Sequence, residues 1–352
     1  MNFASDNIAG PAPAVLEAIV AAGHGTQPAY GADAFSARSS ALINELFERD
    51  CAVFLVATGT AANALALGAI TRPYDAIFCH EEAHISEDEC GAPELFTSGA
   101  KIVGIAGQGG KITPAAFETT LARYPRGPVR SVQPGALSLS QATEAGTIYT
   151  PAEIEALAAI AHRAGAAVHM DGARFANALV SLGVTPAAMT WRAGVDVLSF
   201  GFTKNGALAC EAVIFFDPAR AAEFAFQRKR GGHTLSKGRL LGAQMQAMLQ
   251  GGLWLDLARH ANSMATHLAV GLAALRGVRL AWPRQANEVF PILPDGAVHA
   301  LKAAGAGFYP WTTRALDPAA APREGETLIR LVCSFATLKP EVDQFVAIAR
   351  DA

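Results

Sequence analysis

Two segments of the sequence each end an apolar run with ionisable residues whose types complement each other. Asp171 and Arg174 follow the run at 167–170, and Lys204 follows the run that begins at residue 195. Such runs are typical of buried parallel strands. A lysine amine forms a Schiff base with an aldehyde, and a carboxylate keeps a pyridine nitrogen protonated. Asp171 and Lys204, with Arg174 close to the aspartate, therefore predict a binding site for pyridoxal 5'-phosphate.

A third segment, residues 56–63, lies where an expected strand meets an expected helix and suits a phosphate group. A helix N-terminus offers an anion free backbone N–H groups and the positive end of the macrodipole. Gly59 lets an anion approach the backbone, and Thr60 adds a hydroxyl group. A plain turn with a threonine cap is the alternative, because the segment matches neither a Walker A loop nor a dinucleotide fingerprint.

The segment from His80 to His84 matches the H-E-x-x-H pattern of zinc hydrolases. That chemistry needs both imidazoles on one face of a helix. Residues 76–79 instead indicate a strand that ends at His80, so we expect a loop at the sheet edge and no metal site. His84 is better suited to stack on the flat cofactor ring. A hydrogen-bonded structural histidine is the alternative.

Apolar runs alternate with helical patterns over most of the chain. This alternation predicts a mainly parallel central sheet with helices on both faces. Thr150, Pro151 and Glu153 together mark a helix start, and Gly165 marks a stop. The expected strands are residues 52–56, 76–79, 101–105, 136–139, 167–170, 195–199 and 212–216, and the expected helices include 60–70, 151–164 and 240–258.

The pattern changes near Gly251. A helical stretch leads into short strands at 278–281, 288–293 and 327–333 and a helix from Lys339, which indicates a smaller α+β domain. We therefore expect an α/β protein with three parts: an N-terminal segment (1–14), a large cofactor-binding domain (15–250) and a small C-terminal α+β domain (251–352).

Length and composition are typical of a cytoplasmic enzyme. The 352 residues suffice for about two domains. Hydrophobic residues make up 51% and charged residues 17%, so we expect apolar surface buried between subunits, although a large core would also lower the charged fraction. The net charge of -3 provides no basic field for nucleic acid. The five scattered cysteines lack metal-ligand spacing and indicate reduced thiols.

Residues 51–70 form an uncharged stretch about long enough to cross a bilayer. Polar residues at 58–60 and 63 interrupt it, and its pattern changes there from β-rich to helical. A strand, a turn and a helix explain this stretch better, so we expect no membrane association. Residues 1–7 show neither the basic nor the apolar region of a signal peptide.

Motifs over nearly the whole chain resemble those of the low-specificity L-threonine aldolases, and they occur in the family's order. The resemblance implies the fold-type I architecture of pyridoxal-phosphate enzymes. It also implies cleavage of β-hydroxy-α-amino acids to glycine and an aldehyde. The matching residues are 5–7, 30–31, 59–63, 83–84, 141–146, 169–174, 203–204 and 330–332.

The resemblance assigns cofactor roles to five residues. Lys204 would form the Schiff base, and Asp171 would face the ring nitrogen. Gly59 and Thr60 would hold the phosphate. Arg174 would contact the hydroxyl side of the ring and lie close to the substrate.

Further residues are implied to bind the substrate or to act across a subunit boundary. Ser5 and Arg330 would bind the substrate carboxylate, and a planar guanidinium suits that task on chemical grounds as well. The family forms dimer-based, usually tetrameric assemblies with active sites shared between subunits. Tyr30 and a basic residue within 228–237, with Lys237 as our choice, are the candidates for such shared contacts.

Two positions depart from the family's pattern. Glu144 stands where many relatives have a histidine, and Asp88 stands where several have an aromatic residue. Both positions lie near the substrate's β-hydroxyl group in the family. We therefore expect the base for retro-aldol cleavage to be His84, whose imidazole titrates near neutral pH, or Glu144.

Three other functions compete with the aldolase. An aminotransferase or a β-eliminating lyase on the same fold would use the same lysine and aspartate but would release an α-keto acid. A zinc hydrolase would bind metal, and a non-catalytic protein would bind the cofactor without turnover. The sequence predicts the aldolase with pyridoxal 5'-phosphate as its cofactor.

Overall fold

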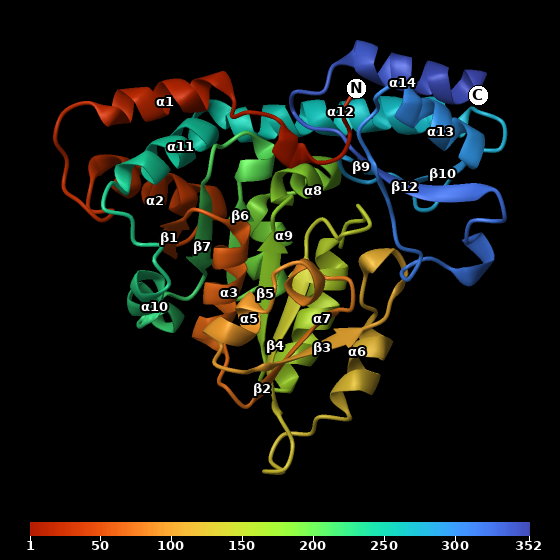
Figure 1. Cartoon of the computed structure of the whole chain (residues 1–352). Coiled ribbons are helices and arrows are strands. Elements are labelled where there is room, and N and C mark those ends of the chain that lie inside the picture. The colour runs from red at the N-terminus through yellow and green to blue at the C-terminus, as the bar shows by residue number, and fades with distance from the viewer.

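A seven-stranded sheet forms the centre of the protein, which we describe from a computed structural model of residues 1–352 (Figure 1). Its strands follow the order β1-β7-β6-β5-β4-β2-β3. All neighbours are parallel except for β7, which runs antiparallel to β1 and β6. The sheet is therefore mainly parallel, as predicted. Its strands are β1 (Ala52–Val56), β2 (Asp75–His80), β3 (Lys101–Ile105), β4 (Gln133–Ser140), β5 (Ala167–Gly172), β6 (Val197–Gly201) and β7 (Glu211–Phe215).

Successive side chains of a strand point to opposite faces of the sheet, and β6 shows how both faces are covered. Leu198 and Phe200 join the largest core cluster with helices α2, α7 and α8. Val197 packs on the other face, in a cluster with α3 and α10. Helices thus cover both faces, as expected. They are α1 (Pro13–Gly23), α2 (Ala34–Phe47), α3 (Gly59–Ile70), α4 (His84–Glu87), α5 (Ala92–Phe96), α6 (Pro114–Leu121), α7 (Pro151–Arg163), α8 (Phe175–Leu182), α9 (Pro186–Met189) and α10 (Phe224–Arg230).

A second sheet lies in the C-terminal part of the chain and has its own core. Its strands β11, β12, β10 and β8 are adjacent in that order, and β9 pairs with the far end of β12. The chain start joins this part: the Phe3 N–H donates to the Gly307 carbonyl, and the Val332 N–H donates to the Phe3 carbonyl. Residues just after Phe3 are thereby fixed beside β12. The elements here are β8 (Arg279–Leu280), β9 (Glu288–Val289), β10 (Pro291–Pro294), β11 (Tyr309–Pro310), β12 (Glu326–Val332), α13 (Asp295–Ala303) and α14 (Lys339–Asp351).

Two predicted elements were wrong. The expected helix at 240–258 is two helices, α11 (Arg239–Leu249) and α12 (Leu253–Ala273). Gly251 and Gly252, with φ of 68° and 78°, break the helix, because glycine enters the left-handed region at little cost. The expected strand at 288–293 is divided between β9 and β10 at Pro291, which has no N–H to continue a ladder. The division of the chain after residues 14 and 250 stays a prediction.

None of the helices is both long and apolar enough to span a membrane. All five cysteines are free thiols.

Candidate active site

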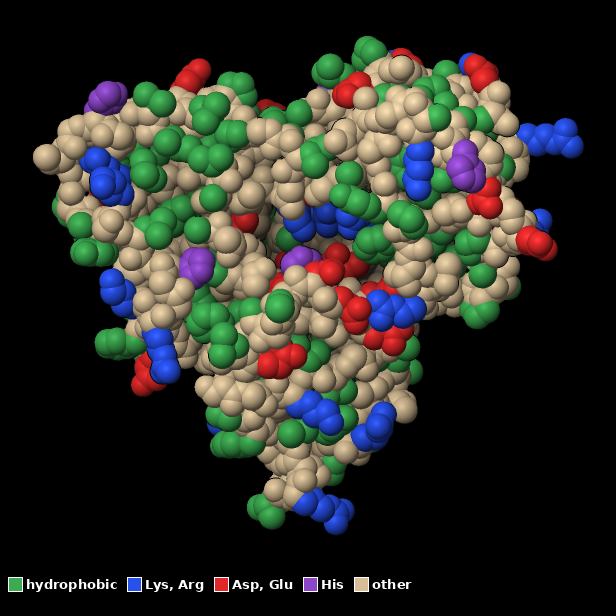
Figure 2. Space-filling model, in the orientation of Figure 1, with side chains coloured by type: hydrophobic (Ala, Val, Ile, Leu, Met, Phe, Trp, Pro, Cys, Tyr) green, Lys and Arg blue, Asp and Glu red, His purple; other side chains and the backbone are tan.

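Two adjoining cavities open at the carboxyl ends of β5 and β6. The first has a volume of about 570 Å³, and the second has a volume of about 460 Å³. In Figure 2 this region is the central hollow, where acidic, basic and histidine side chains gather. The residues that line both cavities are Asn7, His84, Asp88, Glu144 and Lys204.

The N-terminus of α3 forms one end of the first cavity. Thr58 caps the helix, and its hydroxyl accepts a hydrogen bond from the Ala61 N–H at 3.2 Å. Gly59 and Thr60 also line the cavity. A Cβ atom added at Gly59 would meet no atom within 4 Å, so this helix end faces open space. Backbone N–H groups and the macrodipole thus favour an anion there.

Asp171 points from the end of β5 toward α3 and is buried. Its Oδ2 accepts a hydrogen bond from Asn63 Nδ2 at 2.9 Å, and its Oδ1 accepts one from the Ala173 N–H at 3.0 Å. Burial alone would raise the pKa of this carboxyl, but the positive charges of His84 and Lys204 outweigh burial and hold that pKa below its ordinary value. Asp171 is therefore a buried carboxylate that remains ionised.

A chain of polar side chains runs across the sheet beneath Asp171. His169 Nδ1 lies 2.8 Å from Ser138 Oγ, and His169 Nε2 lies 2.9 Å from Ser199 Oγ. Ser199 lines the first cavity. Burial lowers the pKa of His169 to about 4, so the imidazole is neutral. These bonds satisfy polar groups that the sheet would otherwise bury without partners.

Lys204 lies in the turn after β6 and makes no hydrogen bond or ion pair. The turn is fixed by Glu211, whose Oε2 accepts a hydrogen bond from the Phe202 N–H at 2.7 Å. Burial raises the pKa of Glu211 to about 7. The amine of Lys204 is thus presented to the first cavity without a partner of its own.

His84 begins α4 at the edge of both cavities. Its Nδ1 lies 2.8 Å from Oε1 of Glu89, a side chain that is fully buried. Asn63 Nδ2 donates to the same oxygen at 2.8 Å. The hydrogen bond to Glu89 raises the pKa of His84 and outweighs burial. Burial raises the pKa of Glu89, so the pair retains a proton toward neutral pH.

His80 belongs to a different arrangement from His84. It ends β2, and its Nε2 lies 2.9 Å from the Gly107 carbonyl oxygen. Its Nδ1 accepts a hydrogen bond from the Glu82 N–H. Backbone groups therefore occupy both ring nitrogens, and the two histidines share no helix face. The H-E-x-x-H pattern has no zinc-hydrolase geometry here.

Arg174 lines the second cavity and is held by two buried carboxylates. Its Nε and Nη2 donate to Asp6 at 2.8 and 3.2 Å, and its Nη2 lies 3.4 Å from Glu288. Asn287 Nδ2 also donates to Asp6 at 3.1 Å. Burial raises the pKa of Glu288 to about 7, although Arg174 and Arg330 lie nearby. The guanidinium of Arg174 is thus held firmly in place at the cavity wall.

Ser5 and Arg330 also line the second cavity, although 325 positions separate them in the sequence. Arg330 Nη2 donates to the Ala4 carbonyl at 3.2 Å, and the guanidinium lies 4.6 Å from the centre of the Trp311 ring. Its Nε is buried and has no partner. The hydroxyl of Ser5 caps the turn that follows it by accepting from the Asn7 N–H. The guanidinium of Arg330 is therefore anchored through Nη2, and its Nη1 makes no hydrogen bond within the chain.

Tyr30 and Lys237 lie outside both cavities. Tyr30 is exposed, and the Lys229 ammonium lies 4.9 Å from its ring centre. Tyr30 lines a separate cavity of about 250 Å³ together with Arg228 and His233. Lys237 is exposed. Within one chain, these two predicted residues do not join the other site residues.

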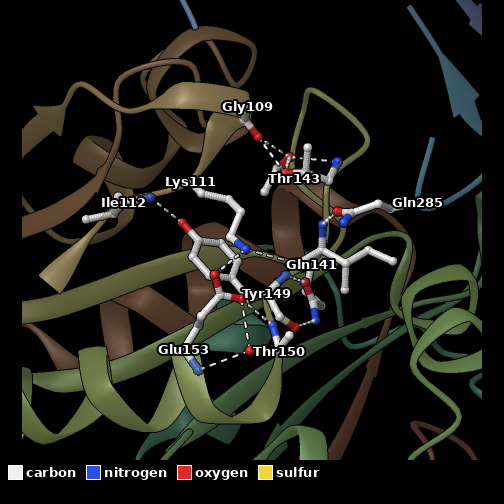
Figure 3. A network of polar contacts seen from close by, with 11 residues as sticks. Gly109, Lys111, Ile112, Gln141, Thr143, Tyr149, Thr150, Glu153 and Gln285 are labelled. Carbon is white, nitrogen blue, oxygen red and sulfur yellow. Dashed lines mark hydrogen bonds and ion pairs between the residues drawn. The ribbon is translucent and has the colours of Figure 1, made fainter. Parts of the chain in front are cut away.

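Glu144 lies on a loop that a dense hydrogen-bond network holds between α7 and the segment at 108–112 (Figure 3). Thr143 Oγ1 donates to the Gly109 carbonyl at 3.0 Å. Gln141 exchanges two hydrogen bonds with the backbone of Tyr149, and the Ile112 N–H donates to the Tyr149 hydroxyl at 2.6 Å. Glu144 therefore projects from a well-supported loop.

Sequence reasoning missed the acidic residues that support the site. Asp6, Glu89, Glu211 and Glu288 are all buried, and each contacts or lies beside a predicted site residue. Asp6 falls within the 5–7 motif, which was the one available signal. Nothing local distinguishes the other three from surface glutamates.

The residues present fit pyridoxal 5'-phosphate. The open space at the α3 N-terminus suits the phosphate, the unpartnered amine of Lys204 suits the aldehyde, and the ionised Asp171 suits a protonated ring nitrogen. The first cavity places all three groups around one space, and His84 lies on the same wall.

Comparisons with known proteins agree with this geometry. Residues 2–293 match the family model described as beta-eliminating lyase. The low specificity L-threonine aldolase of Pseudomonas sp. (strain NCIMB 10558) is 40% identical over 349 residues, which are 99% of this chain and 97% of that protein. The protein of the same description from Pseudomonas aeruginosa is 41% identical over 350 residues, with 99% and 96% covered.

A solved structure gives the same result. Threonine aldolase from Leishmania major superposes with a TM-score of 0.91 at 31% identity and covers 99% of this chain and 98% of its own. This likeness confirms the fold-type I architecture that the sequence predicted. The chain therefore belongs to the low-specificity L-threonine aldolase family, within the beta-eliminating lyases.

Proposed function

We propose that the protein is a pyridoxal-phosphate-dependent aldolase that cleaves L-threonine, L-allo-threonine and related β-hydroxy-α-amino acids to glycine and an aldehyde. One observation carries the proposal. The unpartnered amine of Lys204 and the buried carboxylate of Asp171 share a cavity that adjoins Ser5 and Arg330. The relatives named as threonine aldolases support the same substrates.

Five residues would hold the cofactor. Lys204 would bind its aldehyde carbon, Asp171 would keep a proton on its ring nitrogen, and Gly59 with Thr60 would bind its phosphate. His84 would stack on the ring. When bound, the cofactor supplies an electron sink for negative charge at the substrate's Cα.

The second cavity would orient the substrate. Arg330 and Ser5 line it, Arg330 Nη1 has no partner within the chain, and the two residues would together bind the α-carboxylate. Fixing the carboxylate sets which bond at Cα stands perpendicular to the cofactor ring, and this selects the Cα–Cβ bond for cleavage. Arg174, held by Asp6, would contact both the substrate's α-carboxylate and the ring hydroxyl of the cofactor, and would thereby fix their relative positions.

His84 and Glu144 are the candidates for the base that removes the β-hydroxyl proton. Both line both cavities, and Asp88 lies beside them. His84 carries the stronger case, because its hydrogen bond to Glu89 raises the pKa of the imidazole. Comparison of His84→Asn with Glu144→Gln decides between them. A His84→Asn enzyme with normal threonine cleavage would leave Glu144 as the base.

Borohydride reduction of the purified enzyme tests the proposal as a whole. The expected result is a covalent mass increment on the peptide that contains Lys204, together with glycine and acetaldehyde from L-threonine before reduction. If that peptide is unmodified, Lys204 does not bind the cofactor covalently and the proposal is refuted. An α-keto acid as the product would instead indicate an aminotransferase or a β-eliminating lyase.

We also propose a cytoplasmic homotetramer built from dimers. Several large apolar side chains are exposed in the single chain, and burial between subunits would remove them from water. Tyr30 is one of these exposed side chains and, with Lys237, would reach the active site of a neighbouring subunit. The exposed side chains are Leu16, Val20, Tyr30, Phe226 and Leu235.

A further inference from the structure

The second cavity is far more polar than threonine requires. Of its 13 lining residues, only Trp311 is hydrophobic. Its volume of about 460 Å³ also exceeds what a methyl group fills. A methyl group gains free energy by leaving water for apolar surroundings, and this cavity offers almost none. The wall beyond the substrate's β-carbon is therefore suited to a larger and polar substituent.

The positive groups of this cavity already have partners or tasks. Arg174 is paired with Asp6, and Arg330 and Lys204 face the substrate carboxylate and the cofactor under the proposed function. Arg314 is paired with two acids of the cavity wall: its Nη2 lies 3.0 Å from Glu87 and its Nε 3.5 Å from Glu82.

Two carboxylates of the cavity remain without any partner. The side chains of Asp88 and Glu144 make no hydrogen bond and no ion pair, and both line the space where the two cavities join. A third acid of the wall, Glu82, is 5% exposed and is already paired, because its Oε1 lies 3.5 Å from Arg314 Nε. Asp88 is exposed and Glu144 is half-buried, and a ligand that brings charged N–H donors into the cavity would form charge-assisted hydrogen bonds with both.

The loop network keeps the charge of Glu144 in place (Figure 3). On one side, Thr143 bonds to the Gly109 carbonyl. On the other, Lys111 donates to the Ile148 carbonyl at 3.1 Å, and Gln285 accepts from the Ile148 N–H at 2.7 Å. Because both sides of the loop are held, Glu144 provides a preorganised negative charge at the cavity wall.

We propose that this enzyme favours β-hydroxy-α-amino acids whose β-substituent ends in a cation, such as an ammonium group, and that Asp88 and Glu144 select it. This inference rests on the proposed function and names the substrate class of the same site. The substrate carboxylate would bind Arg330, and the distal cation would lie between the two free carboxylates of Asp88 and Glu144. The negative charges of Asp88 and Glu144 would repel an anionic substituent.

The test uses the holoenzyme and three synthetic substrates of equal chain length that end in an ammonium, a hydroxyl or a carboxylate group, with L-threonine as reference. We expect kcat/KM for the ammonium substrate to exceed that for the hydroxyl substrate by about tenfold, as one charge-assisted contact provides. The carboxylate substrate should be the poorest. Added salt should reduce the differences.

Asp88→Asn provides the matched variant, because Glu144 is also a candidate base. It should lower the ratio of ammonium to hydroxyl turnover severalfold, whereas Asp50→Asn, an exposed aspartate outside both cavities, should leave the ratio unchanged. Equal rates for all three substrates, or an unchanged ratio in Asp88→Asn, would overturn the inference even if L-threonine is cleaved. Failure to cleave L-threonine and all three substrates would instead overturn the proposed function.

Discussion

Glu89 links the two groups that flank the cofactor site. Its Oε1 lies 2.8 Å from His84 Nδ1 and accepts a hydrogen bond from Asn63 Nδ2, and Asn63 Nδ2 also donates to Asp171 at 2.9 Å. The carboxylate expected at the ring nitrogen and the imidazole expected on the ring face therefore belong to one buried hydrogen-bonded chain. A change at Glu89 should reach both ends of it.

Glu89→Gln tests this chain through the pH dependence of catalysis. Loss of the negative charge removes the cause that raises the pKa of His84, so that pKa should fall. If neutral His84 is the base, the acid limb of kcat/KM moves to lower pH and the maximal rate drops by up to about 100-fold, because the imidazole is less basic and less well placed. Initial-rate measurements of threonine cleavage across the pH range provide the profile.

The control is Glu155→Gln, which changes an exposed glutamate on α7 that has no partner. Its pH profile should match that of the wild type. An unshifted acid limb in Glu89→Gln would show that Glu89 does not set the protonation of His84.

Asp6→Asn should weaken the fold at neutral pH and change its response to acid. Burial alone would raise the pKa of Asp6, but Arg174 outweighs burial and lowers it. A depressed pKa stabilises the fold above the unfolded value of about 3.9, and this stabilisation is lost as pH falls through the folded value. Loss of one partner of a buried pair costs about 3 kcal/mol, near the low end of the usual range because Glu288 remains.

Urea unfolding at several pH values measures both effects. The variant should unfold at lower urea than the wild type at neutral pH, and the difference should shrink below the unfolded pKa of aspartate. A constant difference down to the most acidic pH would contradict the assignment to the ionised Asp6 carboxylate.

Tyr149→Phe tests the network under the Glu144 loop. The Tyr149 hydroxyl accepts the Ile112 N–H at 2.6 Å and is buried, so its loss leaves a buried donor unsatisfied. We expect a cost of about 1–3 kcal/mol in the free energy of unfolding. Tyr74→Phe, at an exposed tyrosine, should change stability by less than about 0.5 kcal/mol. If the two variants have equal unfolding midpoints, the hydrogen bond to Tyr149 does not contribute to stability.

Sequence patterns located the cofactor-binding strands within a few residues. The run predicted at 195–199 is β6 (Val197–Gly201), and the run at 167–170 is β5 (Ala167–Gly172). Their hydrophobic content and β-branched residues are local properties, and parallel strands bring their carboxyl ends to one edge of a sheet. Asp171 and Lys204 could therefore be predicted to lie together.

Sequence patterns failed where a boundary depended on backbone conformation. Apolar spacing continues through Gly251 and Gly252, so the pattern alone predicts one helix. The extended Gln250 ends α11, and the left-handed φ of Gly251 and Gly252 turns the chain before α12 begins. Periodicity reports which face is apolar and does not report whether the backbone turns.

The sequence by itself determined the family's order of motifs, the alternating strands and helices, and the lysine and aspartate at neighbouring strand ends, because each depends on residues close together in the chain. Only the tertiary structure decided which acids support the site. Asp6 meets Arg174 across 168 positions, and Glu89 meets Asn63 across 26. Pairing of buried charges depends on proximity in space, and a glutamate that folding will bury has the same local sequence signal as one that will stay in water.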